Sequence, residues 1–366
     1  MRRFRNVAPV TAGAGWIGLH VYAGHPLIAA AAAHPFVGWG IVLTAPAISI
    51  LPMFARRNHA LRLRSFAHWI GYATMSLFCA LLVVALASDT AHLASVIAHA
   101  PWNGTLMSSG AVAAAILLTF VGLLQARRPR VVHLAVKIAE LPADLRGYRI
   151  VQWSDVHVGP TIRRSFVESL VERTNALEPD AIAITGDLVD GYLDDLRDAV
   201  QPLAQLRARD GVFYVTGNHE YYWRASEWIP ALQRLGLTFL KNEHRVVRDG
   251  LVIAGVTDPA GRYTHKTDVA KALAAAPADA KKILLAHRPQ AANDASRYGV
   301  DLQLSGHTHG GQFFPFNLLI RWFQPVVSGL HRVGTMLLYV SRGTGYWGPP
   351  SRLGVGGEIT IIELRD

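Results

Sequence analysis

The sequence has 366 residues, enough for two domains of ordinary size, and a single cysteine, Cys79, which excludes a disulfide framework within the chain. Its formal net charge is +10, but residues 1–130 hold ten Lys and Arg against one acid, whereas residues 131–366 hold 26 against 25. Because the basic excess belongs to the first third alone, nucleic acid is excluded from the partners that we expect.

Residues 1–130 are predicted to form a transmembrane helical domain. Three long stretches contain no Asp, Glu, Lys or Arg: Asn6–Ala55, Ser65–Ser88 and Thr90–Ala126. Since a spanning helix needs ~20 apolar residues, we expect about four transmembrane helices. They are placed at about residues 10–33, 36–55, 66–88 and 106–126. Glycine and proline interrupt the first, and a cleaved signal peptide is the alternative there, although its apolar run is long for one.

Arginine clusters predict the orientation of these helices. They precede the first span, separate the second from the third and follow the fourth: Arg2, Arg3, Arg5; Arg56, Arg57, Arg62, Arg64; Arg127, Arg128, Arg130. The connection from Asp89 to Gly104 has neither Lys nor Arg. Because basic loops stay in the cytoplasm, we expect a multi-pass protein of the cell inner (cytoplasmic) membrane, with its catalytic domain on the cytoplasmic side.

Residues 131–366 are predicted to form an α/β domain. After a short connecting stretch, apolar runs alternate with helical stretches from Tyr148 onward, which favours a sandwich of two mixed sheets with helices outside. Strands are predicted at Arg149–Ser154, Asp180–Thr185, Val212–Thr216, Leu251–Val256, Lys282–Ala286, Asp301–Ser305, Met336–Ser341 and Glu358–Leu364. Helices are predicted at Arg163–Ala176, Asp194–Arg207, Arg224–Leu235 and Thr267–Ala275.

Five segments at predicted strand ends carry side chains that bind metal ions. They are Ser154-Asp155-Val156-His157, Gly186-Asp187, Gly217-Asn218-His219-Glu220, His287-Arg288-Pro289 and Gly306-His307-Thr308-His309-Gly310-Gly311. Open α/β sheets bind ligands at the carboxyl ends of strands. The i, i+2 spacing within the first and last segments would point two side chains the same way on extended backbone. Carboxylates, imidazoles and one amide oxygen suit Mn, Fe, Zn or Ni.

In this order the segments resemble the pattern D-x-H, G-D, G-N-H-[DE], H and G-H-x-H of the calcineurin-like metallophosphoesterase superfamily, across residues 149–311. The resemblance implies a four-layer α/β-β/α sandwich and a phosphoric ester hydrolase that uses two divalent metal ions. It implies that Asp187 bridges both ions and that His219 contacts the phosphate and donates a proton. The other ligands that it implies are Asp155, His157 and His309 for the first ion, and Asn218, His287 and His307 for the second.

Several nearby residues have two interpretations. Arg288 and Arg342 either bind phosphate or a head group, which places them with Asn218 and His219 in the substrate-binding set, or are solvated arginines. The two acids Asp190 and Asp258 are interpreted as turn and capping residues rather than catalytic ones.

The C-terminal segments Ser341-Arg342-Gly343-Thr344-Gly345 and Pro349-Pro350-Ser351-Arg352 are similar to those of membrane-associated bacterial metallophosphoesterases. Some members of that branch are UDP-diacylglucosamine hydrolases of lipid A synthesis. The similarity implies a phosphoester or pyrophosphate bond in a lipid-linked substrate, with the lipid bilayer as a partner. Two alternatives stay open: the same chemistry on a soluble nucleotide or phosphoprotein, and a non-catalytic membrane sensing module.

The segment Gln312–Phe323 follows the last ligand loop and is rich in large apolar side chains, with Arg321 as its only charge. One interpretation is a buried loop or short helix that completes the core. The other is an exposed apolar patch that contacts the membrane or a lipid substrate.

Overall fold

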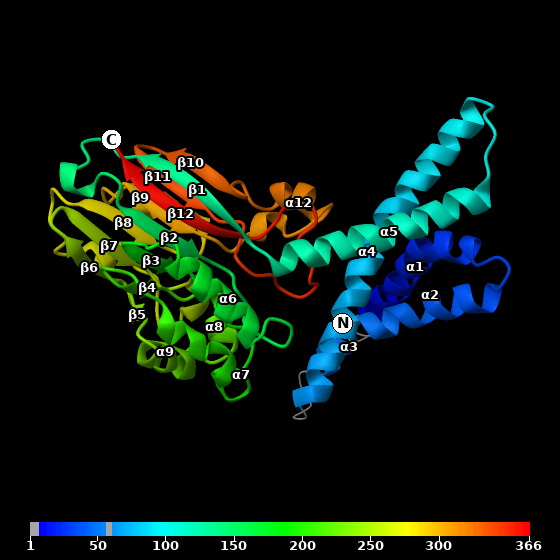
Figure 1. Ribbon diagram of the computed structural model, residues 1–366, viewed down its shortest axis with the longest axis horizontal. Helices are drawn as coiled ribbons and strands as arrows, with labels where there is room; N and C mark the ends of the chain where they lie inside the picture. The colour runs from blue at the N-terminus through cyan, green and yellow to red at the C-terminus, as the bar shows by residue number, and fades with distance from the viewer. Residues whose placement is uncertain (1–6, 56–60) are drawn as a thin grey trace. The chain divides into compact units, whose positions relative to one another are not determined.

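The structure is a computed structural model that describes residues 7–55 and 61–366, apart from the side chains of residues 7–12, 61 and 62. Contacts within the chain divide it into two units (Figure 1). The first comprises Met1–Leu124 with Gly348–Leu353, and the second comprises Gln125–Trp347 with Gly354–Asp366.

The first unit is helical. Its elements are α1 (Val7–Ala30), α2 (Pro35–Ser49), α3 (Leu51–Ala55), α4 (Leu61–Ile97) and α5 (Gly104–Arg127). In the described part of the chain, three helical segments are long and apolar enough to cross a membrane: Pro35–Ala55, Leu63–Ile97 and Gly104–Arg127. Since α1 is not among them, the predicted number of four spans is approximate. Of the arginines that predict orientation, Arg2, Arg3, Arg5, Arg56 and Arg57 lie outside the described residues.

Large apolar side chains cover much of the outside of these helices. Phe54, Leu117 and Phe120 are each more than half exposed. Such exposure is unfavourable in water, but it is normal for a helix that is surrounded by lipid. A helix suits lipid because its backbone hydrogen bonds are all made within the helix. The first unit is therefore suited to a bilayer.

The second unit contains two six-stranded sheets. The first has the order β1 (Arg130–Lys137), β12 (Glu358–Arg365), β2 (Arg149–Trp153), β3 (Ala181–Ile184), β4 (Val212–Tyr214), β5 (Thr238–Phe239). The second has the order β10 (Gly329–Val333), β11 (Met336–Val340), β9 (Leu302–Ser305), β8 (Lys281–Leu285), β7 (Leu251–Gly255), β6 (Glu243–Arg248).

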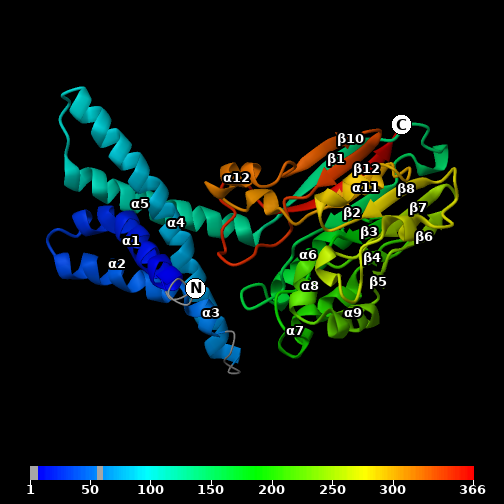
Figure 2. The same ribbon diagram turned by 180° about the vertical axis from the view of Figure 1, so that it is seen from behind.

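Three apolar clusters hold the layers together. On β3, Ile182 and Ile184 belong to the cluster formed with the helices α6 (Arg164–Asn175), α7 (Leu193–Val200) and α9 (Ala225–Arg234). The alternate residues, Ala181 and Ala183, belong to the cluster between the two sheets. A third cluster joins the second sheet to α10 (Val269–Leu273) and α11 (Ala292–Ala295). Of these two helices, α11 is labelled beside the sheet in Figure 2. Burial of each of the Ile side chains on β3 stabilises the folded state by ~1.5–3 kcal/mol. The predicted four-layer α/β-β/α sandwich is confirmed.

Some predicted element bounds were wrong. The stretch after Arg130 is not a connection but the strand β1, which pairs in parallel with β12. The helix predicted at Asp194–Arg207 ends at Val200, where a 3₁₀ turn with Pro202 near its start continues the chain. Proline lacks the amide hydrogen that continued helix would use.

Candidate metal centre

Five loops converge at one edge of the sandwich. The strands β2, β3 and β4 run parallel in the first sheet, and β7, β8 and β9 run parallel in the second. The predicted ligand segments follow β2, β3, β4, β8 and β9, so their side chains meet at the carboxyl ends of both parallel sets. The sequence forms these strands because most of their residues are apolar and most are buried.

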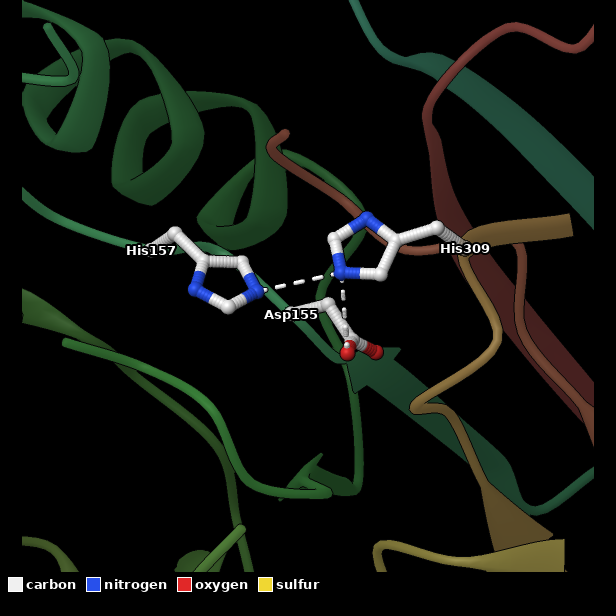
Figure 3. A group of neighbouring side chains, drawn as sticks. All are labelled: Asp155, His157 and His309. Atoms are coloured by element: carbon white, nitrogen blue, oxygen red, sulfur yellow. Dashed lines mark hydrogen bonds and ion pairs between the residues drawn. The ribbon is translucent and has the colours of Figure 1, made fainter. Parts of the chain in front are cut away.

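One group of candidate ligands consists of Asp155, His157 and His309, which point toward one another in Figure 3. The Nε2 atoms of His157 and His309 lie 3.1 Å apart. The Nε2 atom of His309 lies 3.3 Å from Oδ1 of Asp155. All three residues come from loops after β2 and β9, one strand from each sheet.

A second group consists of Asp187, His287 and His307. The Nε2 atom of His287 lies 3.3 Å from Oδ2 of Asp187 and 3.2 Å from Nδ1 of His307. The same Asp187 oxygen lies 3.8 Å from Nε2 of His157, in the first group. Asp187 is thus the carboxylate within reach of both groups.

An unsatisfied polar atom supports the fit of this donor set to divalent cations. The side-chain oxygen of Asn218 is buried and has no hydrogen-bond partner within the described part of the chain. A buried polar atom without a partner costs about 1–3 kcal/mol. Each group of His and Asp also presents its ligand atoms within 4.8 Å of one another. Carboxylate, imidazole and amide donors at these separations suit Mn, Fe, Zn or Ni.

The backbone at the site is strained. Five of the seven predicted ligands have positive φ angles: Asp155 (52°), His157 (55°), Asp187 (50°), His307 (72°) and His309 (53°). Residues with a side chain adopt this left-handed conformation at a cost of order 1–3 kcal/mol, and such residues cluster at functional sites. The extended backbone predicted for the i, i+2 pairs is therefore wrong. Indeed His307 and His309 join different groups.

Two glycines leave room for the carboxylates. A Cβ atom on Gly217 would overlap the carboxyl group of Asp187, and one on Gly306 would overlap the side chains of Ser154 and Asp155. These close approaches explain why the ligand segments carry glycine next to the site.

Burial and neighbouring charge set the protonation of the ligands. Burial, with the nearby His219, holds the pKa of His157 well below its ordinary value, and burial lowers the pKa of His307 to about 3. Neutral imidazoles are the form that coordinates a metal ion. Burial alone would raise the pKa of Asp187, but the charge of His287 holds that pKa well below its ordinary value. Asp187 is thus a carboxylate.

Two supporting contacts orient the ligands. The Nδ1 atom of His287 lies 2.8 Å from the Thr185 carbonyl oxygen, so it donates there and leaves Nε2 facing Asp187. Glu220, to which sequence reasoning gave no role, accepts hydrogen bonds from the backbone amides of Gly217 and Leu188 at 2.6 and 2.8 Å. Such partners fix the orientation of metal ligands.

His219 forms a third candidate group with His157 and Asp187, and Asp190 holds its ring. Its Nδ1 atom is 3.0 Å from Oδ1 of Asp190, and its Nε2 atom is 3.9 Å from Oδ2 of Asp187. Burial alone would lower the pKa of His219. The hydrogen bond to Asp190 and the charge of Asp187 outweigh burial, so the pKa of His219 is raised. Sequence reasoning missed this role of Asp190, although its position three residues after Asp187 was a usable signal.

Asp190→Asn is expected to slow hydrolysis of phosphoesters with poor leaving groups by ~10–100-fold, the usual cost of losing an orienting partner. Metal content should stay unchanged, because Asp190 belongs to none of the three candidate ligand groups. Trp223→Phe is the matched control, since the indole of Trp223 donates to the same Asp190 oxygen at 2.8 Å. The measurement is turnover against leaving-group pKa. A loss that is equal for good and poor leaving groups would contradict the assignment.

The two arginines of the predicted substrate-binding set lie at the edges of the site. Nε of Arg288 lies 2.8 Å from Oδ2 of Asp258, and both residues line a cavity of about 450 Å³ that His287 also borders. Asp258 also accepts a hydrogen bond from the Ala260 amide, which confirms its capping role. The side chain of Arg342 is half exposed, and its stem faces Gly310 in the last ligand loop.

Comparisons with known proteins agree with this geometry. The family profile described as calcineurin-like phosphoesterase matches residues 148–311, which include every candidate ligand. The chain is 34% identical over 261 residues to an uncharacterized metallophosphoesterase of Aquifex aeolicus, covering 69% of this chain and 97% of that protein.

Two vertebrate relatives also contain membrane segments by name. A transmembrane protein with metallophosphoesterase domain from Bos taurus is 42% identical over 273 residues, covering 70% of this chain and 62% of the relative. One of the same name from Danio rerio is 40% identical over 264 residues, covering 68% and 60%. The chain therefore spans about three fifths of the length of these two relatives.

Proposed function

The chain belongs to the calcineurin-like phosphoesterase family, and we propose that it hydrolyses phosphoric esters at this site with two divalent metal ions. The observation that carries the proposal is the position of Asp187 between the two groups of histidines. Asp155, His157 and His309 would hold one ion, and Asn218, His287 and His307 the other, with Asp187 shared. When bound, such ions polarise phosphoryl oxygens and lower the pKa of a water molecule that attacks phosphorus.

His219 is the proton donor in this proposal. Because Asp190 accepts the hydrogen bond of Nδ1, the protonated ring presents its second N–H, at Nε2, on the side of Asp187. The raised pKa of His219 favours this protonated form. A leaving alkoxide would take that proton as its bond to phosphorus breaks, and a positioned acid of this kind is worth ~10²–10⁴-fold in rate.

Hydrolysis of chromogenic phosphomonoesters and phosphodiesters tests the proposal. We expect turnover that is lost after chelation and restored by at least one of Mn, Fe, Zn or Ni. Metal binding without turnover of any substrate would instead support the non-catalytic sensing module.

We propose further that the substrate is lipid-linked. The helix α5 is a candidate membrane span that ends at Arg127, and β1 begins at Arg130. So short a connection keeps the catalytic unit close to a bilayer. A soluble phosphoester is the second candidate, favoured by the cavity beside His287 and Arg288, which has the size of a small-molecule site. The same assay with a lipid-linked and a short water-soluble substrate separates the two.

The catalytic unit is proposed to face the cytoplasm. In a Cys79→Ala background, a cysteine at Ala94, near the end of α4, should react with an impermeant reagent added outside the cell. A cysteine at Asn58, which lies outside the described residues, should react only after the cells are opened. These expectations follow from the arginines that flank the helices. The reverse labelling pattern would place the catalytic unit outside and exclude cytoplasmic lipid precursors as substrates.

A further inference from the structure

The segment after the last ligand loop exposes a row of large apolar side chains. It contains α12 (Phe316–Leu319) and a 3₁₀ turn (Ile320–Trp322), neither of which has a buried residue. Trp322 is 80% exposed and Phe323 is 77% exposed. Of the two interpretations of Gln312–Phe323, burial holds for Phe313, and exposure is confirmed for the residues that we call the apolar rim: Phe314, Phe316, Leu318, Leu319, Trp322 and Phe323.

This exposure is unfavourable in water. Removing such side chains from water is favourable, so the apolar rim leaves a large stabilisation unused. Single exposed apolar residues are ordinary, but a contiguous set on one short segment marks an interaction surface.

The apolar rim packs against the last ligand loop. A Cβ atom on Gly311 would overlap the backbone of Asn317, so α12 packs directly on the turn that carries His309. The side chain of Gln312 donates to the Trp347 carbonyl at 2.8 Å and accepts from the Trp347 amide at 2.9 Å. Whatever binds the apolar rim therefore binds close to the metal centre.

The sequence around the apolar rim is basic. Residues 302–347 contain no Asp or Glu but three arginines, Arg321, Arg332 and Arg342. Arg321 and Arg332 are exposed. By contrast, an ion pair between Glu243 and Arg245 lies on β6, at the edge of the second sheet opposite β10. An apolar surface in a stretch of sequence whose only formal charges are positive is complementary to an anionic bilayer, which attracts nearby Arg side chains.

The geometry points to a lipid bilayer as the partner of the apolar rim: we propose that these side chains insert into the lipid–water interface and dock the catalytic unit there. Trp with flanking Arg is the composition of interfacial segments. The short connection from Arg127 to Arg130 keeps a bilayer always within reach, whereas a second copy or another protein has to be met by diffusion. Docking requires no phosphoesterase activity, so it goes beyond the proposed function.

Fluorescence quenching in the full-length protein tests the proposal. In the Cys79→Ala background, Trp322→Cys carries an environment-sensitive dye, and the protein is reconstituted into phosphatidylcholine vesicles that contain phosphatidylglycerol. Val246→Cys is the matched control, because Val246 is 53% exposed on β6, at the sheet edge opposite β10. Nitroxide-labelled lipids should quench the dye several-fold more at position 322 than at 246, and less without phosphatidylglycerol. Equal quenching at both positions would overturn the proposal.

A second labelling position controls for local misfolding caused by the substitution at Trp322. Leu318→Cys, on α12, should give the same quenching as Trp322→Cys, with an unchanged melting temperature and metal content. If instead oxidation links two chains through these cysteines and lipid quenching is weak, the apolar rim is an interface between copies and the bilayer proposal is wrong. Because no substrate is used, failure here is distinct from failure of the proposed hydrolysis.

Discussion

Asp187→Asn is expected to abolish phosphoester hydrolysis and to lower the metal content of both groups of ligands. Its Oδ2 atom lies 3.3 Å from His287 in one group and 3.8 Å from His157 in the other, so the change removes negative charge from both. Loss of an outer partner of a metal site already costs ~10–100-fold, so loss of the shared ligand should exceed ~100-fold. Turnover and elemental analysis of the purified protein measure the two effects.

Asp194→Asn is the matched control for this variant. It removes the same charge from an exposed side chain on α7, where only a weak ion pair with Arg197 at 3.8 Å is lost. Its turnover and metal content should equal those of the unchanged protein. If Asp187→Asn kept two equivalents of metal and near-normal turnover, the bridging assignment would be wrong.

His219→Ala is expected to keep its metal and to lose ~10²–10⁴-fold in rate on substrates with poor leaving groups. Substrates whose leaving group needs no proton should lose far less. The physical reason is that Nε2 of His219 faces Asp187 at 3.9 Å, while Asp190 holds Nδ1 at 3.0 Å, so the ring is positioned to donate. The measurement is the dependence of rate on leaving-group pKa.

His244→Ala controls for the loss of an imidazole elsewhere in the same unit. The Nδ1 atom of His244 lies 2.9 Å from the Ala272 carbonyl oxygen, away from the candidate ligands. The His244→Ala variant should show the same dependence of rate on leaving-group pKa as the unchanged protein. A uniform loss across all leaving groups in His219→Ala would reassign His219 from proton donation to phosphate binding.

The central strands of the fold were predictable because their residues are buried on both faces. Ala181–Ile184 is a wholly buried run of apolar residues, as is typical of a buried parallel strand. Leu302–Ser305 is also wholly buried, although it includes Gln303 and Ser305. The strands that were missed are β1, β5, β6 and β10, which are the four edge strands of the two sheets. All of them except β1 are polar or very short. The partner of β1 is β12, which lies at the other end of the domain in the sequence but beside β1 in the sheet. No local sequence pattern therefore predicts that pairing.

The sequence was enough to predict which side chains lie together at this edge of the sheets, but not the backbone conformation that positions them. Side-chain type and position after a strand are properties of the sequence, whereas a positive φ at His307 or His309 depends on the surrounding packing. The same limit applies to Asp190, whose contact with His219 joins two loops 29 residues apart. It applies also to Gln312–Phe323, whose composition suits a core as well as a surface.

The number of divalent ions that full activity requires tests the central claim most directly. Metal-free protein is titrated with Mn²⁺ while bound metal and phosphoester hydrolysis are followed together. The account predicts that hydrolysis rises to its maximum only as a second equivalent binds, because Asp187 serves both groups of ligands. Full hydrolysis in the metal-free protein, or a maximum reached with one equivalent, would contradict it.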